Sequence, residues 1–593
     1  MVPVSALIDF SSPGETGDAP RLRHAFGAPR EVLQARTATE VRPLLDAVQA
    51  QARQGRWCVG YLRYEAAGAF DPALAVRDPD GPLAWFGVHD GPLPWPPGEG
   101  DAAQPSLAWE EALSRREFDL ALSQLHEAIA AGQLYQVNYT STLRGRLDVA
   151  AGADPHAAAR ALFAALQRAQ PGGYAAYIDD GEEQVLSASP ELFFDWRAGR
   201  LLARPMKGTA ARGATAQQDA QAAARLRHSA KERAENVMIV DLLRNDMSRL
   251  AEPFSVRVPR LFHVEALPTV WQMTSDVEAR TRSGCTLGDV FEALFPCGSV
   301  TGAPKVSAMR MIRQLEREPR GVYCGAVGLV RPGGDATFNV PIRTVTLRGG
   351  VARCGIGSGI VAESRSDGEW QEWQHKRAFL DRASAPFELL ETLALEDGRL
   401  RDAPAHLARM AAAATHFGYP WPEQAAAQRL EQLRQAHPQG RWRVRLLLDQ
   451  RGRVQAQAHA QDAAPPRVRL QLADRPLDAS DSEFVRFKTT RRAHYEAFAP
   501  TREGVFDTLL WNARGELTEC TRGNVAFRID GRWVTPPLAC GLLGGIGRER
   551  WLREGRLAES VVRLEDLPRL EALAFVNSLR GWIDAELDAP PIA

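Results

Sequence analysis

The pattern of this sequence changes near Ala383–Pro386, where one series of motifs ends and another begins. A single hydrophobic core rarely organises as many residues as the 593 of this chain. With 45% apolar and 24% charged residues, the chain has the composition of ordinary globular domains that bury their own cores. We therefore expect two domains, residues 1–383 and residues 384–593.

The charge of the chain argues against some classes of function. The net charge is -1 at pH 7 and no block of basic residues occurs, so the sequence has no electrostatic footprint for nucleic acid or an anionic membrane. The N-terminus lacks the features of a signal peptide, and no apolar run approaches the ~20 residues of a membrane span. The seven cysteines form no CxxC pair, which is typical of reduced thiols. We expect a cytoplasmic protein.

Lysine is rare in this chain and occurs only at positions 207, 231, 305, 376 and 488. Arginine stays protonated, whereas a desolvated lysine can lose its proton and attack carbon or form a Schiff base. We therefore expect chemistry where lysine is kept, above all at Lys207 in the segment Arg204–Thr209. For Lys231, beside Glu232 and Arg233, a solvated surface position is an equally good interpretation.

A glutamate in an apolar setting and two glycine-containing loops come next. Glu191 follows Pro190 in an apolar run typical of a strand, where desolvation would raise its pKa and suit a general acid. A turn glutamate is the alternative. The predicted loop at residues 296–305 opens an amphipathic helix, and the predicted loop at Gly355–Ile360 offers backbone N–H groups for an anion.

Three further glutamates indicate a metal site. Glu235 lies on the apolar side of a helix predicted over residues 231–246, while Glu369 and Glu372 are three residues apart. Carboxylates with little positive charge between them suit Mg²⁺, which prefers oxygen ligands. The alternatives are a buried arginine partner for Glu235 and an exposed Glu372–Lys376 pair.

Eight ordered segments together resemble a known family. They are residues 132–140, 187–194, 204–213, 231–246, 296–312, 321–328, 338–344 and 355–376. In this order they resemble the chorismate-binding enzymes: anthranilate, isochorismate and salicylate synthases and aminodeoxychorismate synthase component I. The resemblance covers residues 110–383 and implies an α+β domain of antiparallel sheets with surrounding helices.

The resemblance also implies roles for individual residues. Lysine at position 207 is typical of the aminodeoxychorismate synthases, in which it adds to the ring of chorismate and expels the 4-hydroxyl. Glu191 matches the general acid/base, and Glu235, Glu369 and Glu372 match the Mg²⁺ region. The positions that match substrate-binding residues are Tyr323, Arg343, Gly357, Ser358, Gly359, Lys376 and Lys305.

Two features set limits on the resemblance. Many relatives have histidine where this chain has Gln272, so no role of a histidine is implied there. The 593 residues contain no Gly-x-Cys-x-Gly nucleophile turn. We therefore expect ammonia to come from a separate glutamine amidotransferase or from solution.

The second half contains another ordered set of motifs. Lys488, Glu519, a glycine loop at residues 541–548 and the segment at 577–581 offer an amine, a carboxylate and a phosphate-binding loop. Their order resembles the fold type IV pyridoxal-phosphate (PLP) enzymes, which implies a two-subdomain α/β module. By this resemblance Lys488 binds PLP covalently and Glu519 pairs with its pyridine nitrogen. The predicted phosphate-binding residues are Arg409, Ile546, Gly547 and Ser578, with Gly547 replacing a frequent threonine.

Together the two resemblances imply a function. The first domain would convert chorismate and ammonia to 4-amino-4-deoxychorismate, and the second would eliminate pyruvate to give 4-aminobenzoate for folate synthesis. A PLP aminotransferase in the second half is one alternative. A non-catalytic regulatory module in either half is another, against which the retention of Lys207 and Lys488 argues. The resemblance also allows a homodimer through the PLP domain.

Overall fold

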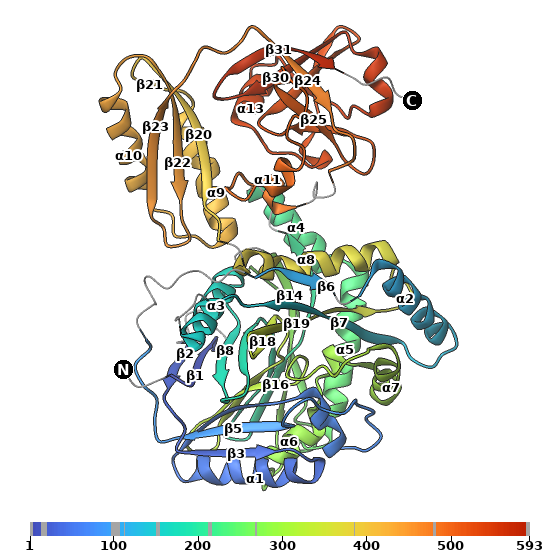
Figure 1. Ribbon diagram of the computed structural model, residues 1–593. Helices are drawn as coiled ribbons and strands as arrows, with labels where there is room; N and C mark the ends of the chain where they lie inside the picture. Colours follow the sequence, from blue (N-terminus) through green and yellow to red (C-terminus); the bar gives the residue numbers. More distant parts are fainter. Residues whose placement is uncertain are drawn as a thin grey trace. The chain divides into compact units, whose positions relative to one another are not determined.

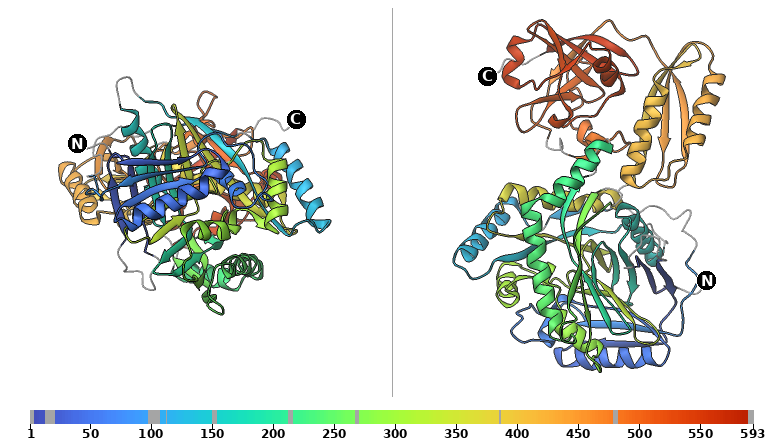
Figure 2. Two further views of the ribbon diagram at one scale, coloured as in Figure 1. Left: turned by 90° about the horizontal axis from the view of Figure 1, so that it is seen from below. Right: turned by 180° about the vertical axis from the view of Figure 1, so that it is seen from behind.

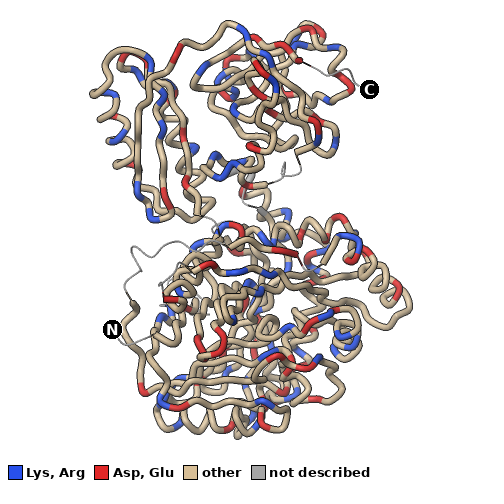
Figure 3. The backbone as a smooth tube through the Cα atoms, viewed as in Figure 1, with Lys and Arg blue, Asp and Glu red and all other residues tan. Residues whose placement is uncertain are grey.

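A computed structural model gives the fold in two compact units, Met1–Pro386 and Phe387–Ala593 (Figure 1). The structure describes residues 4–12, 21–96, 107–111, 113–149, 154–211, 216–266, 270–384, 386–477 and 482–588. Basic and acidic side chains are interspersed along both units (Figure 3). Within the described ranges, none of the helices combines the length and apolar character needed to cross a membrane.

The first unit contains two antiparallel sheets. The order of the nine-stranded sheet is β15 (Gly302–Ala303), β7 (Gln136–Arg146), β19 (Val351–Ile360), β18 (Thr344–Arg348), β9 (Gln184–Ser189), β8 (Tyr174–Asp179), β1 (Ala6–Phe10) and β2 (Leu22–Phe26), with β6 (Trp109–Glu111) paired to β7. The order of the ten-stranded sheet is β12 (Met206–Ala211), β14 (Val270–Arg280), β11 (Arg200–Arg204), β10 (Leu192–Arg197), β17 (Ala336–Asn339), β16 (Ala326–Val330), β4 (Trp57–Leu62), β5 (Ala84–His89) and β3 (Glu31–Ala35), with β13 (Arg257–Ala266) paired to β14.

The two sheets pack face to face, and helices cover their outer faces (Figure 2). Side chains at alternate strand positions fill the space between the sheets, among them Ile8 and Tyr174 from one sheet and Tyr61 and Leu329 from the other. The helices α1 (Ala38–Arg53), α5 (Ala230–Ser248) and α6 (Leu287–Leu294) cover the ten-stranded sheet. The nine-stranded sheet is covered by α2 (Arg115–Ala130), α3 (Pro155–Ala169), α7 (Lys305–Leu315) and α8 (Ser366–Ser384). The predicted α+β class with antiparallel sheets is confirmed.

The predicted glycine loop at Gly355–Ile360 is wrong, because these residues form the second half of strand β19. The side chains of Cys354, Ile356, Ser358 and Ile360 are buried in turn, while the glycines between them face the other way. This period of two is a strand signal that the density of glycine concealed.

The second unit has two sheets. A four-stranded sheet runs β21 (Arg399–Leu400), β20 (Leu389–Glu396), β22 (Arg441–Leu448) and β23 (Val454–Ala460), packed against α9 (Ala403–Phe417) and α10 (Glu423–Ala436). A mixed eight-stranded sheet runs β26 (Leu517–Cys520), β25 (Asp507–Trp511), β24 (Arg467–Leu472), β31 (Gly581–Asp588), β30 (Ala572–Asn577), β27 (Asn524–Ile529), β28 (Arg532–Thr535) and β29 (Ala558–Glu559). The predicted two-subdomain α/β arrangement is confirmed.

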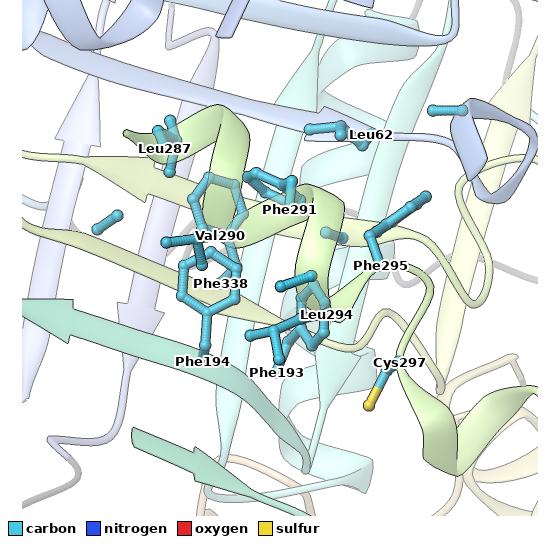
Figure 4. Close-up of a cluster of buried hydrophobic side chains, with 14 of the residues drawn as sticks. Leu62, Phe193, Phe194, Leu287, Val290, Phe291, Leu294, Phe295, Cys297 and Phe338 are labelled. Carbon is cyan, nitrogen blue, oxygen red and sulfur yellow. The ribbon is translucent and has the colours of Figure 1, made fainter. Parts of the chain in front are cut away.

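A cluster of aromatic side chains holds the strand that follows Glu191. Phe291 of α6 lies with its ring centroid 5.3 Å from that of Phe194 on β10 and 5.1 Å from that of Phe338 on β17 (Figure 4). All three rings are fully buried. Because β10 begins at Leu192, directly after Glu191, this packing fixes the backbone from which the glutamate extends.

We expect Phe291→Ala to destabilise the first unit by about 3–5 kcal/mol, because it removes the ring at the centre of this cluster and leaves a cavity. Calorimetric unfolding of the whole chain should show the first unit's transition at lower temperature and the second unit's transition unchanged. Leu120→Ala is a matched control, since Leu120 is 56% exposed. An unshifted transition in Phe291→Ala would contradict this account of the core.

Candidate functional site

Lys207 extends from an irregularity in strand β12. The pairing of β12 with β14 shifts register between Met206 and Thr209, and Gly208 has a φ of 83°. A Cβ placed on Gly359 of β19 would lie 3.3 Å from Nζ of Lys207 and 2.6 Å from Nε2 of Gln136. The amine of Lys207 therefore lies next to a glycine of the other sheet, in space that a side chain at position 359 would enter.

Glu191 lies between strands β9 and β10 and is 3% exposed. Its backbone N–H donates to Oγ of Ser189 at 3.1 Å, and its buried Oε1 accepts no hydrogen bond from the described residues. Burial raises the pKa of Glu191 to about 7, against the lowering effect of the Ser299 hydroxyl and the charge of Lys207. A carboxyl that titrates near neutral pH can both donate and accept a proton, as the predicted role requires.

Two half-buried cations, Arg343 and Lys376, lie in this part of the first unit. The Arg343 guanidinium donates to Oε1 of Gln170 at 3.1 Å, and within the described part of the chain no carboxylate pairs with it. Burial lowers its pKa to about 10. Lys376 donates to the carbonyl oxygen of Gly357 at 2.9 Å and pairs with Glu372 at 2.6 Å, and burial lowers its pKa. Arg343, which pairs with no carboxylate among the described residues, gains most from a bound carboxylate, whereas Lys376 already has Glu372 as a partner.

The other predicted substrate-binding residues line strand β19. The ring of Tyr323 is buried against Gly355, where an added Cβ would lie 2.2 Å from Cδ1 of the ring. Burial raises the pKa of Tyr323 far above its usual value. Strand β18 pairs only with residues 351–354 of β19, so Gly357–Gly359 have one strand partner, β7, among the described strands. Their backbone on the other edge remains available to a ligand.

The structure does not bring two of the predicted residues to this group. The side chain of Ser358 is turned to the other face of β19, where it donates to Oε2 of Glu369 at 2.6 Å, so only its backbone can face a ligand. Lys305 begins helix α7 and pairs with Asp246 of α5 at 2.8 Å, which accounts for its charge without a substrate.

The carboxylates are arranged differently from the predicted metal set. Both oxygens of Glu369 accept hydroxyl hydrogen bonds, from Ser358 at 2.6 Å and from Ser364 at 2.7 Å. Glu235 and Glu372 are instead grouped electrostatically with Glu232: burial raises the pKa of Glu235, and the charges of Glu232 and Glu372 raise it further. Among the described residues, no three His, Cys, Asp or Glu side chains are close enough to hold a metal ion.

These carboxylates lie near cations as well as near one another: Lys376 pairs with Glu372 at 2.6 Å, and Nζ of Lys231 lies 3.9 Å from Glu235. Burial raises the pKa of Glu232 and the charge of Glu372 adds to the effect, whereas Glu372 is exposed and, against the effect of burial, its pKa is lowered by Lys376. Oxygen donors that repel one another are the donor set that Mg²⁺ neutralises. Because no three of the described carboxylates meet at one point, a divalent cation here would also need oxygen ligands from water or substrate, and Glu372 forms the pair with Lys376 that the sequence left open as an alternative.

Sequence reasoning missed two residues of this site. Glu232 precedes Glu235 by three residues on α5, the same spacing that singled out Glu369 and Glu372. Gln136 begins strand β7, is 1% exposed, and its buried Oε1 has no hydrogen-bond partner among the described residues. The repeated spacing could have revealed Glu232, whereas only the packing of β7 against β19 reveals Gln136.

In the second unit, Lys488 and Glu519 have opposite pKa shifts. Burial lowers the pKa of Lys488 to about 8, and the charge of Arg409 lowers it further. Burial raises the pKa of Glu519, on β26, to about 7. Glu519 accepts hydrogen bonds from the Tyr495 hydroxyl at 2.6 Å and from the backbone N–H of Leu543 at 3.2 Å. An amine that loses its proton this easily can form a Schiff base.

Arg409 is held in place by a buried carboxylate that the sequence did not single out. Its Nε and Nη2 donate to the two oxygens of Glu391 at 2.8 and 2.7 Å, and its Nη1 donates to the carbonyl oxygen of Gly544 at 2.7 Å. His406 Nδ1 lies 2.6 Å from the same carboxylate. Burial alone would raise the pKa of Glu391, but Arg409 and His406 lower it to about 2.

The predicted phosphate-binding residues meet around the start of α13 (Ile546–Arg553). A Cβ placed on Gly547 would lie 2.6 Å from the carbonyl carbon of Asn577 and 2.9 Å from the backbone nitrogen of Ser578. The neighbouring backbone thus occupies the space that a threonine side chain would need. Backbone N–H groups at a helix start, together with Ser578 and the nearby Arg409, fit a phosphate group.

We expect Lys488 to react with acetic anhydride at lower pH than an ordinary lysine. With a pKa of about 8, half of Lys488 is in the neutral, reactive form near pH 8, whereas the amine of a model lysine reaches that point near ~10.4. Peptide mass spectrometry of the cofactor-free chain over pH 6–11, with an acetylated lysine amide as reference, measures this. A midpoint equal to that of the reference would contradict the effect of burial.

Comparison with known proteins follows the division of the chain. The family model for chorismate binding enzymes matches residues 14–382, and the model for amino-transferase class IV matches residues 388–586. Aminodeoxychorismate synthase component 1 of Klebsiella aerogenes is 41% identical over 325 residues, 52% of this chain and 68% of the relative. The component 1 of Salmonella typhimurium is 37% identical over 299 residues, 50% of this chain and 63% of the relative.

Two solved structures share the fold of the first unit. Anthranilate synthase component I of Streptococcus pneumoniae aligns with a TM-score of 0.50 at 24% identity, covering 64% of this chain and 92% of that chain. The menaquinone-specific isochorismate synthase of Escherichia coli aligns with a TM-score of 0.50 at 19% identity, covering 64% and 89%. The chain belongs to the chorismate binding enzyme family through residues 14–382 and carries a class IV amino-transferase domain in residues 388–586.

Proposed function

We propose that the first unit replaces the 4-hydroxyl of chorismate with an amino group, giving 4-amino-4-deoxychorismate. This proposal rests on the position of the Lys207 amine, which lies next to Gly359. Its charge also acts on the buried carboxyl of Glu191, whose pKa it lowers. The naming of the Klebsiella and Salmonella relatives supports the same reaction. Ammonia would come from a separate glutamine amidotransferase or from solution.

The residues of the site divide the work of this reaction. Arg343, and Lys376 beside it, bind and orient the carboxylates of the substrate. Glu191 donates a proton to the leaving 4-hydroxyl while the amine of Lys207 adds to the ring, and ammonia then displaces Lys207 and leaves its nitrogen at C4. Glu235 and Glu372, with Glu232, would hold Mg²⁺, which neutralises the ring carboxylate when bound.

We propose that the second unit removes pyruvate from this product to give 4-aminobenzoate. PLP, when bound, supplies an electron sink for the amine-bearing carbon. Lys488 takes the proton from C4, and the bond to the enolpyruvyl oxygen breaks as the ring becomes aromatic. Glu519 would pair with the pyridine nitrogen, and Arg409, Ile546, Gly547 and Ser578 would hold the phosphate.

Amino-group transfer is the second candidate for this unit, because the matching family model is that of class IV amino-transferases. The buried pair of Lys488 and Glu519 serves either chemistry equally well. The two reactions differ in what they need: transfer requires an amino acid as donor or product, whereas elimination of pyruvate requires none.

Substitution of each lysine should stop a different step. With chorismate, ammonium, Mg²⁺ and PLP, we expect the unaltered chain to release 4-aminobenzoate and pyruvate. Lys207→Ala should lower the consumption of chorismate at least ~1,000-fold, because the nucleophile is lost. Lys488→Ala should consume chorismate normally and accumulate 4-amino-4-deoxychorismate. Chromatography with mass detection of each reaction measures the outcome.

Each variant is the control for the other. Lys207→Ala supplied with 4-amino-4-deoxychorismate should still form 4-aminobenzoate, which shows that the substitution leaves the second unit intact. Anthranilate as the product of the unaltered chain would refute the role of Lys207. Accumulated 4-amino-4-deoxychorismate that turns over only when an amino acid or keto acid is added would assign amino-group transfer to the second unit.

A further inference from the structure

The residues around Lys207 form a bulge in strand β12, and strand pairing alone does not fix its conformation. Register between β12 and β14 is regular at Thr209, Ala210 and Ala211 but shifts on the side of Met206. Lys207 and Gly208 lie within this interruption, and Gly208 has positive φ. Glycine is free to adopt many backbone conformations, so its own preference does not fix the direction in which Lys207 points.

Gln272 of β14 lies opposite Thr209 and spans this bulge. Its Oε1 accepts a hydrogen bond from Oγ1 of Thr209 at 3.0 Å, and its Nε2 donates to the carbonyl oxygen of Gly208 at 2.8 Å. Gln272 is 7% exposed, whereas Thr209 is exposed, so both bonds are partly buried. One side chain thus binds the two residues that directly follow Lys207.

From this geometry we infer that Gln272 is a positioning residue, which holds the bulge in the conformation that directs the amine of Lys207 toward Gly359. The inference deepens the proposed function of the first unit and rests on it. Gly208 is closed in on its other side by helix α5, since an added Cβ would lie 2.8 Å from Oε2 of Glu232. The bulge is therefore fixed between Gln272 and a member of the carboxylate group.

The strand that carries Gln272 has other supports. Strand β14 pairs with β11 and β13 as well as β12, and the Ser275 hydroxyl donates to Oδ1 of Asn236 on α5 at 2.6 Å. Loss of the carboxamide therefore leaves the sheet in place and affects the bulge. A side chain that acts in this way should change the rate of the reaction more than the binding of substrate.

The test compares Gln272→Met with Gln49→Met. Gln272→Met keeps the length of the side chain and removes its two hydrogen bonds to the bulge, with Thr209 and Gly208. Gln49 lies on helix α1, away from the site residues, and is also 7% exposed. Its side-chain oxygen accepts a hydrogen bond from the backbone N–H of Leu287 at 3.1 Å. In the full chain we expect kcat for ammonium-dependent consumption of chorismate to fall about ten- to hundredfold in Gln272→Met, with KM for chorismate within about twofold. Gln49→Met should keep the kcat of the unaltered chain.

A second readout does not depend on turnover. The rate of Lys207 acetylation relative to Lys231, measured by peptide mass spectrometry of the same digest, should change at least about threefold in Gln272→Met, because the amine loses its fixed environment. If the unaltered chain does not aminate chorismate, the proposed function fails, and this ratio alone decides the role of Gln272.

A second pair of variants covers a failure of Gln272→Met to fold. Thr209→Val removes one of the two bonds and should give a smaller effect in the same direction, while Thr209→Ser keeps the hydroxyl and should restore the rate. An unchanged Lys207 acetylation ratio with unchanged kcat in Gln272→Met, or an equal loss in Gln49→Met, would overturn the inference.

Discussion

The first site depends on keeping the carboxyl of Glu191 out of water. Burial without a hydrogen-bond partner for Oε1 is what brings the pKa of Glu191 to about 7, and the nearby positive charge limits the rise. Such burial is unfavourable for the fold, so the surrounding structure must be rigid enough to impose it. The aromatic cluster around Phe291 supplies this rigidity next to Glu191. The hydrogen bonds of Gln272 to the bulge supply it next to Lys207.

The second unit also contains a carboxyl whose pKa is raised to about 7 by burial, and it adds a lysine whose pKa is lowered. Lys488 has its pKa lowered to about 8 and Glu519 has its pKa raised to about 7, both chiefly by burial. Arg409 is fixed by its hydrogen bonds to Glu391 and to the Gly544 carbonyl. Of the five lysines of the chain, Lys488 has a pKa lowered far enough to lose its proton near neutral pH, which an arginine could not do.

The sequence predicted the two families and the fold class of each unit, because each family has a long ordered series of motifs. It failed where function depends on contacts across strands. Nothing local to Glu369 shows that Ser358 and Ser364 engage both of its oxygens. Gln136 and Lys207 both lie next to Gly359 only through the packing of β7, β19 and β12, and Glu391 meets Arg409 only through the packing of β20 against α9.

The glycines of strand β19 show how local sequence and packing across strands are related. A sequence rich in glycine predicts a loop, since glycine weakens strands. Here the same glycines are required within a strand. An added Cβ on Gly355 would overlap the ring of Tyr323, and one on Gly359 would lie too close to the side chains of Gln136 and Lys207. The alternating buried residues hold the strand in the sheet, while the glycines leave its other face open. Access of a ligand to the buried amine of Lys207 is therefore a direct consequence of the pattern that obscured the strand.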